Sequence, residues 1–496
     1  MRILMVTAEA VPFAKTGGLA DMVSALSIQL TKMGHDVKIV MPRYYRIDRK
    51  KLNQLSGPMA IAAGRVETWS AVYTAKMPGC DDLPVYFIDH EGCYGRDGIY
   101  GVPGETDFHD NPYRFAVLAH GAFQLCRKLG WYPDIVHAHD WSACLAPVLA
   151  KHVCRYCGFE GTASVLTIHN QGYQGQYSKD QFPALGIDWG LYYGAGFEHE
   201  GGINFLQAGV SSADMITTVS PTYAREIQTM EGGFGMDGLL RVRSDVIRGI
   251  LNGADVKEWN PEIDKKIPAN YSVKDMSGKA RCKAELQKQM GLEVNPDIPV
   301  VGIVTRLVDQ KGIAEVFAPT YGSAYGICTT MNVQFAVLGS GEAWCENEIR
   351  ALQEKLPNLR AYIGYDDRLS HLIEAGSDFF LMPSKYEPCG LNQIYSMLYG
   401  TLPIVRRTGG LADTVENYNQ DTGSGTGFVF DSLTPQAVYD TVGWAVWAYY
   451  NRKDHIKKMQ ELGMRETFGW DKAAEGYLEV YKEAVRRGCG REYSGS

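Results

Sequence analysis

Short apolar segments that end in a turn and lead into a helical pattern recur along both halves of this 496-residue chain. In the first occurrence, residues 3–7 are largely apolar, residues 19–33 carry apolar side chains at helical spacing, and residues 37–41 form a second apolar segment that Pro42 ends. This order predicts a βαβ unit, because a helix between two parallel strands returns the chain to the same end of the sheet. The chain is therefore predicted to have an α/β fold with parallel sheets.

The same pattern begins again near residue 299. Further strand-like segments occur at residues 135–137, 163–168, 299–304, 333–338, 361–365, 379–382 and 402–405. Residues 69–88 alternate more between apolar and polar side chains, which predicts an antiparallel excursion. Between the two sets, Asn-Gly at residues 252–253 and Asn-Pro at residues 260–261 are typical of a boundary and hinge.

Two sets of this kind predict two Rossmann-like, doubly wound domains. We place the N-terminal domain at residues 1–248 and the C-terminal domain at residues 249–470. A final helix within residues 471–496 is expected to pack back on the N-terminal domain. Ligands of open α/β sheets bind at the carboxyl ends of the strands, so we expect two such edges to face each other across an interdomain cleft.

The overall composition argues against several classes of protein. The 49 Lys and Arg against 57 Asp and Glu give a net charge of −8, which disfavours nucleic acid as the main partner. No apolar run reaches about 18 residues, so no membrane span is expected, and Glu9 ends the first apolar run too early for a signal peptide. The 11 scattered cysteines are typical of reduced thiols, and the Cys154–Cys157 pair lacks the partners of a zinc site. We expect a cytoplasmic protein, or a plastid one if the chain is a processed plant protein.

One seven-residue pattern occurs in both halves. Residues 15–21 read Lys-Thr-Gly-Gly-Leu-Ala-Asp, and residues 407–413 read Arg-Thr-Gly-Gly-Leu-Ala-Asp. Each copy lies after a predicted strand and before a predicted helix, where a ligand of an open sheet would bind. A Thr-Gly-Gly step is also an ordinary tight turn, so each copy taken alone is ambiguous. Two copies at matching positions favour a role in binding.

The sequence motifs of two classes of nucleotide-binding protein are missing. The first turn has no Gly-x-Gly-x-x-Gly, and residues 339–341 begin such a pattern without its third glycine. The chain also lacks a Walker A sequence. A hydride-transferring dehydrogenase is therefore disfavoured.

Charged residues follow two predicted strands of the second half. Arg306 and Lys311 could close on a diphosphate, since arginine gives forked hydrogen bonds and lysine a point charge, although either alone suits an ordinary surface. Glu387 comes before Pro388, which we expect in the first turn of a helix whose free amides could hold phosphate. Glu387 could contact sugar hydroxyls or a developing positive charge, or could simply be a favourable charge at a helix start.

Histidines follow two predicted strands of the first half. We expect His137 and His139 to point to opposite faces of an extended strand, which disfavours a metal site that combines them with Asp140. His169 and Asn170 come after the next strand and suit a polar site, although a single histidine there is commonly structural. No metal ligand set is predicted.

These motifs occur together in one order that is highly specific. The sequence closely resembles the bacterial glycogen synthase and plant starch synthase family, which are retaining glucosyltransferases with the GT-B fold. The resemblance spans nearly the whole chain and rests on residues 15–21, 137–141, 167–170, 218–224, 249–253, 306–312, 387–391 and 406–413.

The resemblance implies an activity and a set of site residues. Glucose would pass from ADP-glucose to the 4-hydroxyl at the non-reducing end of an α-1,4-glucan, glycogen or a maltooligosaccharide, with retention and without a metal or other cofactor. The residues implied as catalytic are Lys15, His169, Arg306, Lys311 and Glu387. The residues implied in binding are Lys15, Gly17, Gly18 and Asp21 from the first domain, Asp140, His169 and Asn170 beside the sugar, Arg306 and Lys311 with Thr408 and Gly409 at the diphosphate, Glu387, Cys389, Gly390 and Leu391 at the glucosyl unit, and Tyr365 against the adenine.

Two residues depart from the family pattern. Gln207 and Lys385 stand where lysine and arginine are frequent. Neither is implied in holding the diphosphate. The alternatives are a related GT-B enzyme that uses UDP-glucose or another acceptor, and a glucan-binding protein that has lost catalysis. A pyridoxal-phosphate phosphorylase has the same type of fold but is usually much longer.

Overall fold

The computed structural model describes residues 1–102 and 107–492, and these residues divide into two compact units. The first unit contains residues 1–253 together with the C-terminal residues from Trp470 onward, and the second contains residues 254–469. The chain thus passes from one unit to the other at Gly253–Ala254 and returns at Gly469–Trp470. These positions lie within a few residues of the boundaries expected from the sequence.

The first unit is built on a parallel sheet with an antiparallel extension. Its strand order is β13-β12-β8-β7-β1-β2-β6-β5-β3, with β4 paired to β5. The strands are β1 (Arg2–Val6), β2 (Asp36–Pro42), β3 (Asn53–Gln54), β4 (Met59–Ile61), β5 (Thr68–Met77), β6 (Cys80–Asp89), β7 (Ile135–His139), β8 (Ala163–Ile168), β12 (Met215–Thr218) and β13 (Ile247–Gly249). The antiparallel pair β5–β6 confirms the excursion predicted for residues 69–88.

Helices cover the sheet of the first unit because their apolar side chains lie on one face. In α1 (Gly18–Lys32), Leu19, Met22, Val23, Leu26 and Leu30 are buried. The other helices of eight residues or more are α3 (Asn111–Leu129), α6 (Phe205–Ser212) and α18 (Trp470–Cys489). Shorter helices are α2 (Glu91–Tyr94), α4 (Leu145–Val148), α5 (Leu191–Gly194), α7 (Pro221–Glu226) and α8 (Asp237–Val242). The C-terminal helix α18 packs on β8 and beside α1, so the end of the chain completes the first unit.

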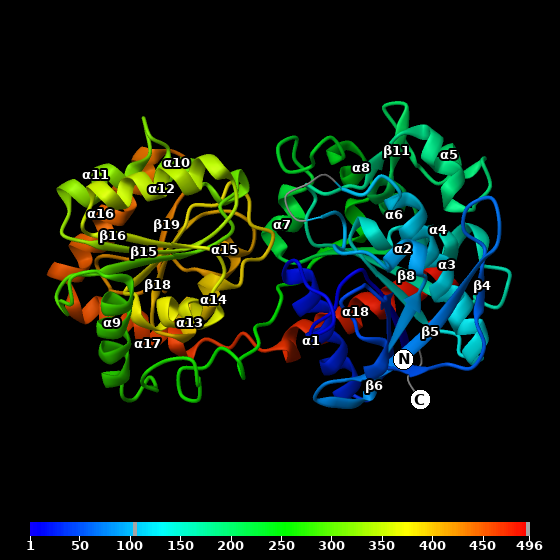
Figure 1. The fold of residues 1–496 in the computed structure, drawn as a ribbon, viewed down its shortest axis with the longest axis horizontal. Coiled ribbons are helices and arrows are strands. Elements are labelled where there is room, and N and C mark those ends of the chain that lie inside the picture. The colour runs from blue at the N-terminus through cyan, green and yellow to red at the C-terminus, as the bar shows by residue number, and fades with distance from the viewer. Residues whose placement is uncertain (103–106, 493–496) are drawn as a thin grey trace. The chain divides into compact units, whose positions relative to one another are not determined.

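The second unit has a parallel sheet in the order β16-β15-β14-β17-β18-β19. Its strands are β14 (Val300–Val304), β15 (Gln334–Gly339), β16 (Leu359–Ile363), β17 (Phe379–Met382), β18 (Leu402–Arg406) and β19 (Phe428–Phe430). Its helices are α9 (Ser277–Met290), α10 (Ile313–Phe317), α11 (Ser323–Thr330), α12 (Ala343–Lys355), α13 (Asp367–Gly376), α14 (Asn392–Leu398), α15 (Gly409–Thr414), α16 (Pro435–Asn451) and α17 (Lys453–Arg465). Figure 1 shows α10, α11 and α12 on one face of this sheet and α9 and α13 on the other, so the unit is doubly wound.

Each sheet has a point where the strand order reverses. In the first unit the chain moves outward from β1 through β2 and from β7 through β8, so the reversal lies between β1 and β7. In the second unit it lies between β14 and β17. Open α/β sheets bind ligands at this switch point, beyond the carboxyl ends of the strands. The segments that follow β1, β7, β14 and β17 are therefore the places to look for a site.

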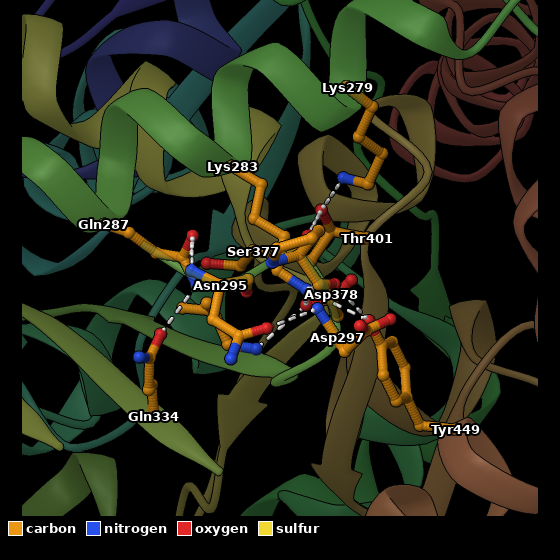
Figure 2. A network of polar contacts seen from close by, with 12 residues as sticks. Lys279, Lys283, Gln287, Asn295, Asp297, Gln334, Ser377, Asp378, Thr401 and Tyr449 are labelled. Carbon is orange, nitrogen blue, oxygen red and sulfur yellow. Dashed lines mark hydrogen bonds and ion pairs between the residues drawn. The ribbon is translucent and has the colours of Figure 1, made fainter. Parts of the chain in front are cut away.

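A structural polar network lies at the amino-terminal ends of the strands of the second sheet, opposite the switch point. Figure 2 shows Lys279, Lys283 and Gln287 projecting from one helix, α9, toward the amino-terminal ends of β14 and β17. Lys283 Nζ lies 2.8 Å from Asp378 Oδ2, which also accepts from the Val300 amide at 2.8 Å. Burial lowers the pKa of Lys279 to about 8, yet its ammonium donates to two backbone carbonyls and to Thr401 Oγ1. These contacts anchor α9 to the sheet, away from the switch point.

No helix among the described residues is long and apolar enough to cross a membrane.

Candidate active site

The segment after β1 is held by a buried carboxylate that the sequence analysis did not single out. Glu9 is 2% exposed and accepts hydrogen bonds from the Thr16 amide, from Thr16 Oγ1 at 2.7 Å and from Tyr100 Oη at 2.8 Å. Burial raises the pKa of Glu9, and the hydrogen bonds from Thr16, Tyr100 and the Gly17 amide oppose that rise. The buried side chain of Glu9 therefore holds Thr16 in place, near the start of the loop at residues 15–21.

The exposed side of this loop carries the residues that the sequence pattern nominated. Lys15 Nζ lies 2.8 Å from the Asp21 carboxylate, and both side chains reach solvent. A Cβ atom added to Gly17 or Gly18 would meet no heavy atom within 4 Å. The loop thus presents a cation and two open backbone positions at the switch point, where a ligand can approach the main chain.

Asp140, directly after β7, has a strained backbone and a buried side chain. Its φ of 57° and ψ of −177° lie in a region that is almost confined to glycine. Asp140 Oδ1 accepts from the His169 amide at 2.7 Å and from the Asn170 amide at 3.4 Å. Burial raises the pKa of Asp140 to about 7, although the two amide hydrogen bonds act against it. Asp140 therefore joins the segments after β7 and β8 into one polar corner.

The expectation for His137 and His139 is wrong. Their ring centroids are 4.1 Å apart with an interplanar angle of 38°, so both side chains lie on the same face of β7. Successive residues of a strand alternate between faces, and residues two apart therefore share a face. His137 is bonded within the unit to Tyr481 Oη at 2.8 Å and Thr167 Oγ1 at 2.6 Å, whereas His139 Nδ1 lies 3.2 Å from His169 Nε2.

These histidines do not form a metal ligand set with the nearby carboxylates. In residues 1–102 and 107–492, no group of three or more His, Cys, Asp or Glu side chains is arranged to hold a metal ion. Burial lowers the pKa of His137 and of His169 to about 3. Both imidazoles are therefore neutral at physiological pH and can act as hydrogen-bond partners rather than as charges.

In the second unit, the segments after β14 and β17 meet through an ion pair. Lys311 Nζ lies 2.6 Å from Glu387 Oε2, and the same oxygen accepts from Ser384 Oγ at 2.9 Å. The side chains of Lys311 and Glu387 are 18% and 7% exposed, so the pair is largely shielded from water. The two loops are also joined by the Lys385 amide, which donates to the Gln310 carbonyl at 2.9 Å.

The pattern at residues 407–413 packs against the Glu387 segment through its glycines. A Cβ on Gly409, whose φ is +43°, would come within 1.9 Å of the Glu387 carbonyl oxygen. A Cβ on Gly410 would come equally close, 1.9 Å, to the Cys389 carbonyl oxygen. The Gly410 amide donates to the Glu387 carbonyl at 3.0 Å. Only glycine permits this approach, and it brings Gly409 and the adjoining Thr408 beside the Glu387 loop.

The expected position of Pro388 in a helix is wrong. Helix α14 begins at Asn392, and residues 387–391 form an irregular segment in front of it. Gly390 has a φ of +69°, a left-handed conformation that a right-handed helix cannot contain, and this delays the helix start. Cys389 is buried at 7% exposure, and Leu391 is partly buried.

The remaining predicted residues lie at the same edges but make fewer contacts. Arg306 follows β14 and is exposed. Asn170 follows β8, is partly buried, and accepts from the Gly172 amide at 2.9 Å. Tyr365 is 86% exposed and comes two residues after β16, which ends at Ile363 and not at residue 365. The predicted residues thus follow the carboxyl ends of β1, β7 and β8 in the first unit and of β14, β17 and β18 in the second, whereas Tyr365 follows β16, two strands away from β14.

Sequence reasoning missed Glu9, Tyr100 and Ser384. Glu9 had a visible signal, because a carboxylate at the end of an otherwise apolar strand segment needs partners when it is buried. Tyr100 and Ser384 had none, since their roles depend on contacts made only in the folded chain.

Comparison with known proteins agrees with this architecture. Residues 2–242 match the family model of the starch synthase catalytic domain, and residues 287–459 match that of group 1 glycosyl transferases. The glycogen synthase of Treponema denticola is 59% identical to this chain over 98% of its length and 99% of the relative's. Glycogen synthase 1 of Geobacter metallireducens is 45% identical over 99% of this chain and 98% of the relative.

Solved structures extend the comparison to three dimensions. The catalytic domain of starch synthase IV from Arabidopsis thaliana, bound to ADP and acarbose, gives a TM-score of 0.87 at 31% identity and covers 98% of this chain and 99% of its own. A sucrose-phosphate synthase from Thermosynechococcus elongatus shares the fold at a TM-score of 0.61 and 15% identity, over 97% of this chain and 98% of its own. The chain therefore belongs to the glycogen and starch synthase family of glycosyltransferases, with the GT-B fold of two doubly wound α/β units.

Proposed function

We propose that this chain transfers glucose from ADP-glucose to the 4-hydroxyl at the non-reducing end of an α-1,4-glucan, with retention of the anomeric configuration. The proposal depends chiefly on the shielded pair of Lys311 and Glu387 at the switch point of the second unit. Family membership supports the reaction type, and the ADP bound by the starch synthase IV relative supports adenine as the base. We also propose a cytoplasmic location, which is consistent with the bacterial glycogen synthase relatives.

The proposed mechanism is stabilisation of the leaving group. A departing ADP gains negative charge on its diphosphate, and Arg306 and Lys311 supply fixed positive charge beside it. Charges held in place before the reaction favour the transition state over the ground state, which lowers the barrier. These cations supply the charge neutralisation that a divalent ion supplies elsewhere, so we expect activity to survive EDTA.

Retention is proposed to occur by attack on the same face as the leaving group. Glu387 Oε2 already accepts hydrogen bonds from Lys311 and Ser384, and a carboxylate engaged in this way is a weaker nucleophile. We assign Glu387 to holding the glucosyl unit and stabilising its positive charge. From the first unit, Lys15 and the Gly17–Gly18 backbone would meet the donor, and His169, Asn170 and Asp140 the sugar.

The test is release of ADP from ADP-glucose, measured with and without a glycogen primer, in EDTA, and beside UDP-glucose. Primer-dependent release of ADP in EDTA supports the proposal. Turnover with UDP-glucose alone would replace the donor while keeping the reaction type. A folded protein that releases neither nucleotide would overturn the proposal and favour another acceptor or a glucan-binding role.

A further inference from the structure

Three histidines at the switch point of the first unit form a buried row with uneven bonding. Both ring nitrogens of His137 are bonded, to Tyr481 and Thr167. His139 has one bonded nitrogen, Nδ1, which lies 3.2 Å from His169 Nε2. His139 Nε2 is buried and has no hydrogen-bond partner among the described residues. His169 keeps 8% of its surface exposed, and no described residue bonds its Nδ1.

The contact between His139 and His169 joins two neutral rings. Burial lowers the pKa of His169 to about 3 and that of His139 well below its usual value, and the neighbouring rings of His137 and His169 lower the affinity of His139 for a proton further. A neutral imidazole has one N–H donor and one lone pair. Only two arrangements are then possible: His169 Nε2–H donates to His139 Nδ1, or His139 Nδ1–H donates to His169 Nε2.

The unpartnered nitrogen of His139 distinguishes these arrangements. In the first, His139 Nε2 carries a proton that has no acceptor in the interior. In the second, the same nitrogen carries only a lone pair. Unpaired buried N–H groups are rarer in folded proteins than unpaired acceptors, which indicates that they cost more. The neighbouring ring of His137 offers no free lone pair, because both of its nitrogens are bonded.

We propose that His139 is a positioning residue that donates from Nδ1 to His169 Nε2 and thereby holds His169 in the Nδ1–H tautomer. His169 then presents an N–H donor at its unbonded nitrogen, suited to an acceptor oxygen such as that of a sugar hydroxyl. The identity of this acceptor rests on the proposed glucosyl transfer, whereas the tautomer does not. His169 thus acts as a neutral donor and not as a base, because its Nδ1 lone pair is replaced by a proton.

The direct test is the tautomer of His169, read by long-range nitrogen–proton NMR of the full chain labelled with ¹⁵N-histidine. The His169 signals are assigned by their loss in His169→Asn. We expect the wild-type protein to show the Nδ1–H form. His139→Phe removes the donor and is expected to release His169 to the Nε2–H form, while His139→Asn, whose amide nitrogen can occupy the place of Nδ1, restores the Nδ1–H form.

His137→Phe is the matched control, since His137 lies on the same face of β7 but does not bond His169. It should lower thermal stability without changing the His169 tautomer. An Nε2–H tautomer in the wild-type protein, or an unchanged tautomer in a folded His139→Phe, would overturn the proposal. Neither result depends on catalysis, so failure of the proposed glucosyl transfer remains a separate outcome.

Kinetics then link the tautomer to turnover. We expect His139→Phe to lower kcat/KM by about 10- to 100-fold, by analogy with the loss of a hydrogen-bond partner that orients a metal-ligating histidine, with His139→Asn recovering most of the loss. If His139→Phe and His139→Asn lose the same fraction of kcat/KM at equal thermal stability, packing at residue 139 matters and not the donated hydrogen bond. That result would overturn the positioning role.

Discussion

The same seven-residue pattern serves two different purposes in the two units. At residues 15–21, the glycines are open, and the loop is supported from below by the side chain of Glu9. At residues 407–413, Gly409 and Gly410 are pressed against the carbonyls of the Glu387 segment. The first copy therefore leaves its backbone accessible to a ligand, whereas the second uses its backbone to position another loop.

The buried carboxylates at the carboxyl ends of the strands also differ between the two units. Glu9 and Asp140 in the first unit are buried against amide and hydroxyl donors, and burial raises the pKa of each. Glu387 in the second unit is buried against the ammonium of Lys311. The comparison teaches that the buried carboxylates of the first unit are held by neutral donors, whereas the buried carboxylate of the second is held by a cation.

We expect the largest effect from removing the positive charge of Lys311 in the second unit. Lys311→Met should lower kcat/KM by about 1000-fold, or about 4 kcal/mol, because the departing diphosphate loses a fixed cation. Lys385→Met is the control: Lys385 lies in the partner loop and pairs with Asp309 at 2.5 Å in a more exposed setting. Steady-state kinetics with circular dichroism would check both. Equal losses in the two variants would contradict the special role of Lys311.

The glycines give the next largest effect, on stability. Gly410→Ala should lower the free energy of unfolding by about 3 kcal/mol, because the new Cβ overlaps a carbonyl oxygen that cannot move freely. Gly18→Ala, at the matching position of the first copy, should change it by less than about 0.5 kcal/mol. Urea unfolding followed by circular dichroism measures both, and similar values would remove the contrast between the two loops.

Asp140 gives a pH-dependent effect at the first edge. The pKa of Asp140 is about 7 in the folded chain, above the ordinary value of 3.8 for an aspartate, so between about pH 4 and pH 7 the folded state binds more protons than the unfolded state. Stability from this group is therefore lost as pH rises through that range. Asp140→Asn should remove this pH dependence. Its free energy of unfolding should therefore rise by about 2 kcal/mol relative to that of the wild type when the pH is raised from 5 to 8. Unfolding curves of both proteins at pH 5 and pH 8 would measure this change. If the difference in free energy of unfolding between variant and wild type is the same at both pH values, the pKa of Asp140 is not raised.

The smallest effect concerns the support beneath the first loop. Thr16→Val removes the hydroxyl donor to Glu9 but keeps the amide donor, and should lower the free energy of unfolding by about 1 kcal/mol. The KM for the nucleotide sugar should rise with it, since Lys15 lies next to the altered residue. Thr16→Ser, which keeps the hydroxyl, is the control and should retain most of the wild-type stability and KM; an equal loss in both variants would contradict the assignment of the effect to the hydroxyl donor.

Local pattern predicted much of the fold and part of the site. The apolar segments at residues 163–168 and 379–382 coincide with β8 and β17, because buried parallel strands are apolar throughout and end sharply at polar loops. The parallel pairing and the doubly wound arrangement followed from the same periodicity. The prediction for Pro388 was wrong because a single left-handed glycine, Gly390, delays the helix start, and no local pattern reveals the sign of φ.

By itself, the sequence determined the fold class, the family and the candidate residues at the strand ends, since periodicity and motif spacing are properties of neighbouring residues. Only the tertiary structure decided which copy of the Thr-Gly-Gly pattern is open, which carboxylates are paired with a cation, and which nitrogen of each histidine is bonded. The physical reason is distance along the chain: Lys311 meets Glu387 across 76 residues, and Glu9 meets Tyr100 across 91. Hydrogen bonds and desolvation act through space, and both arise only when the sheets bring these segments together.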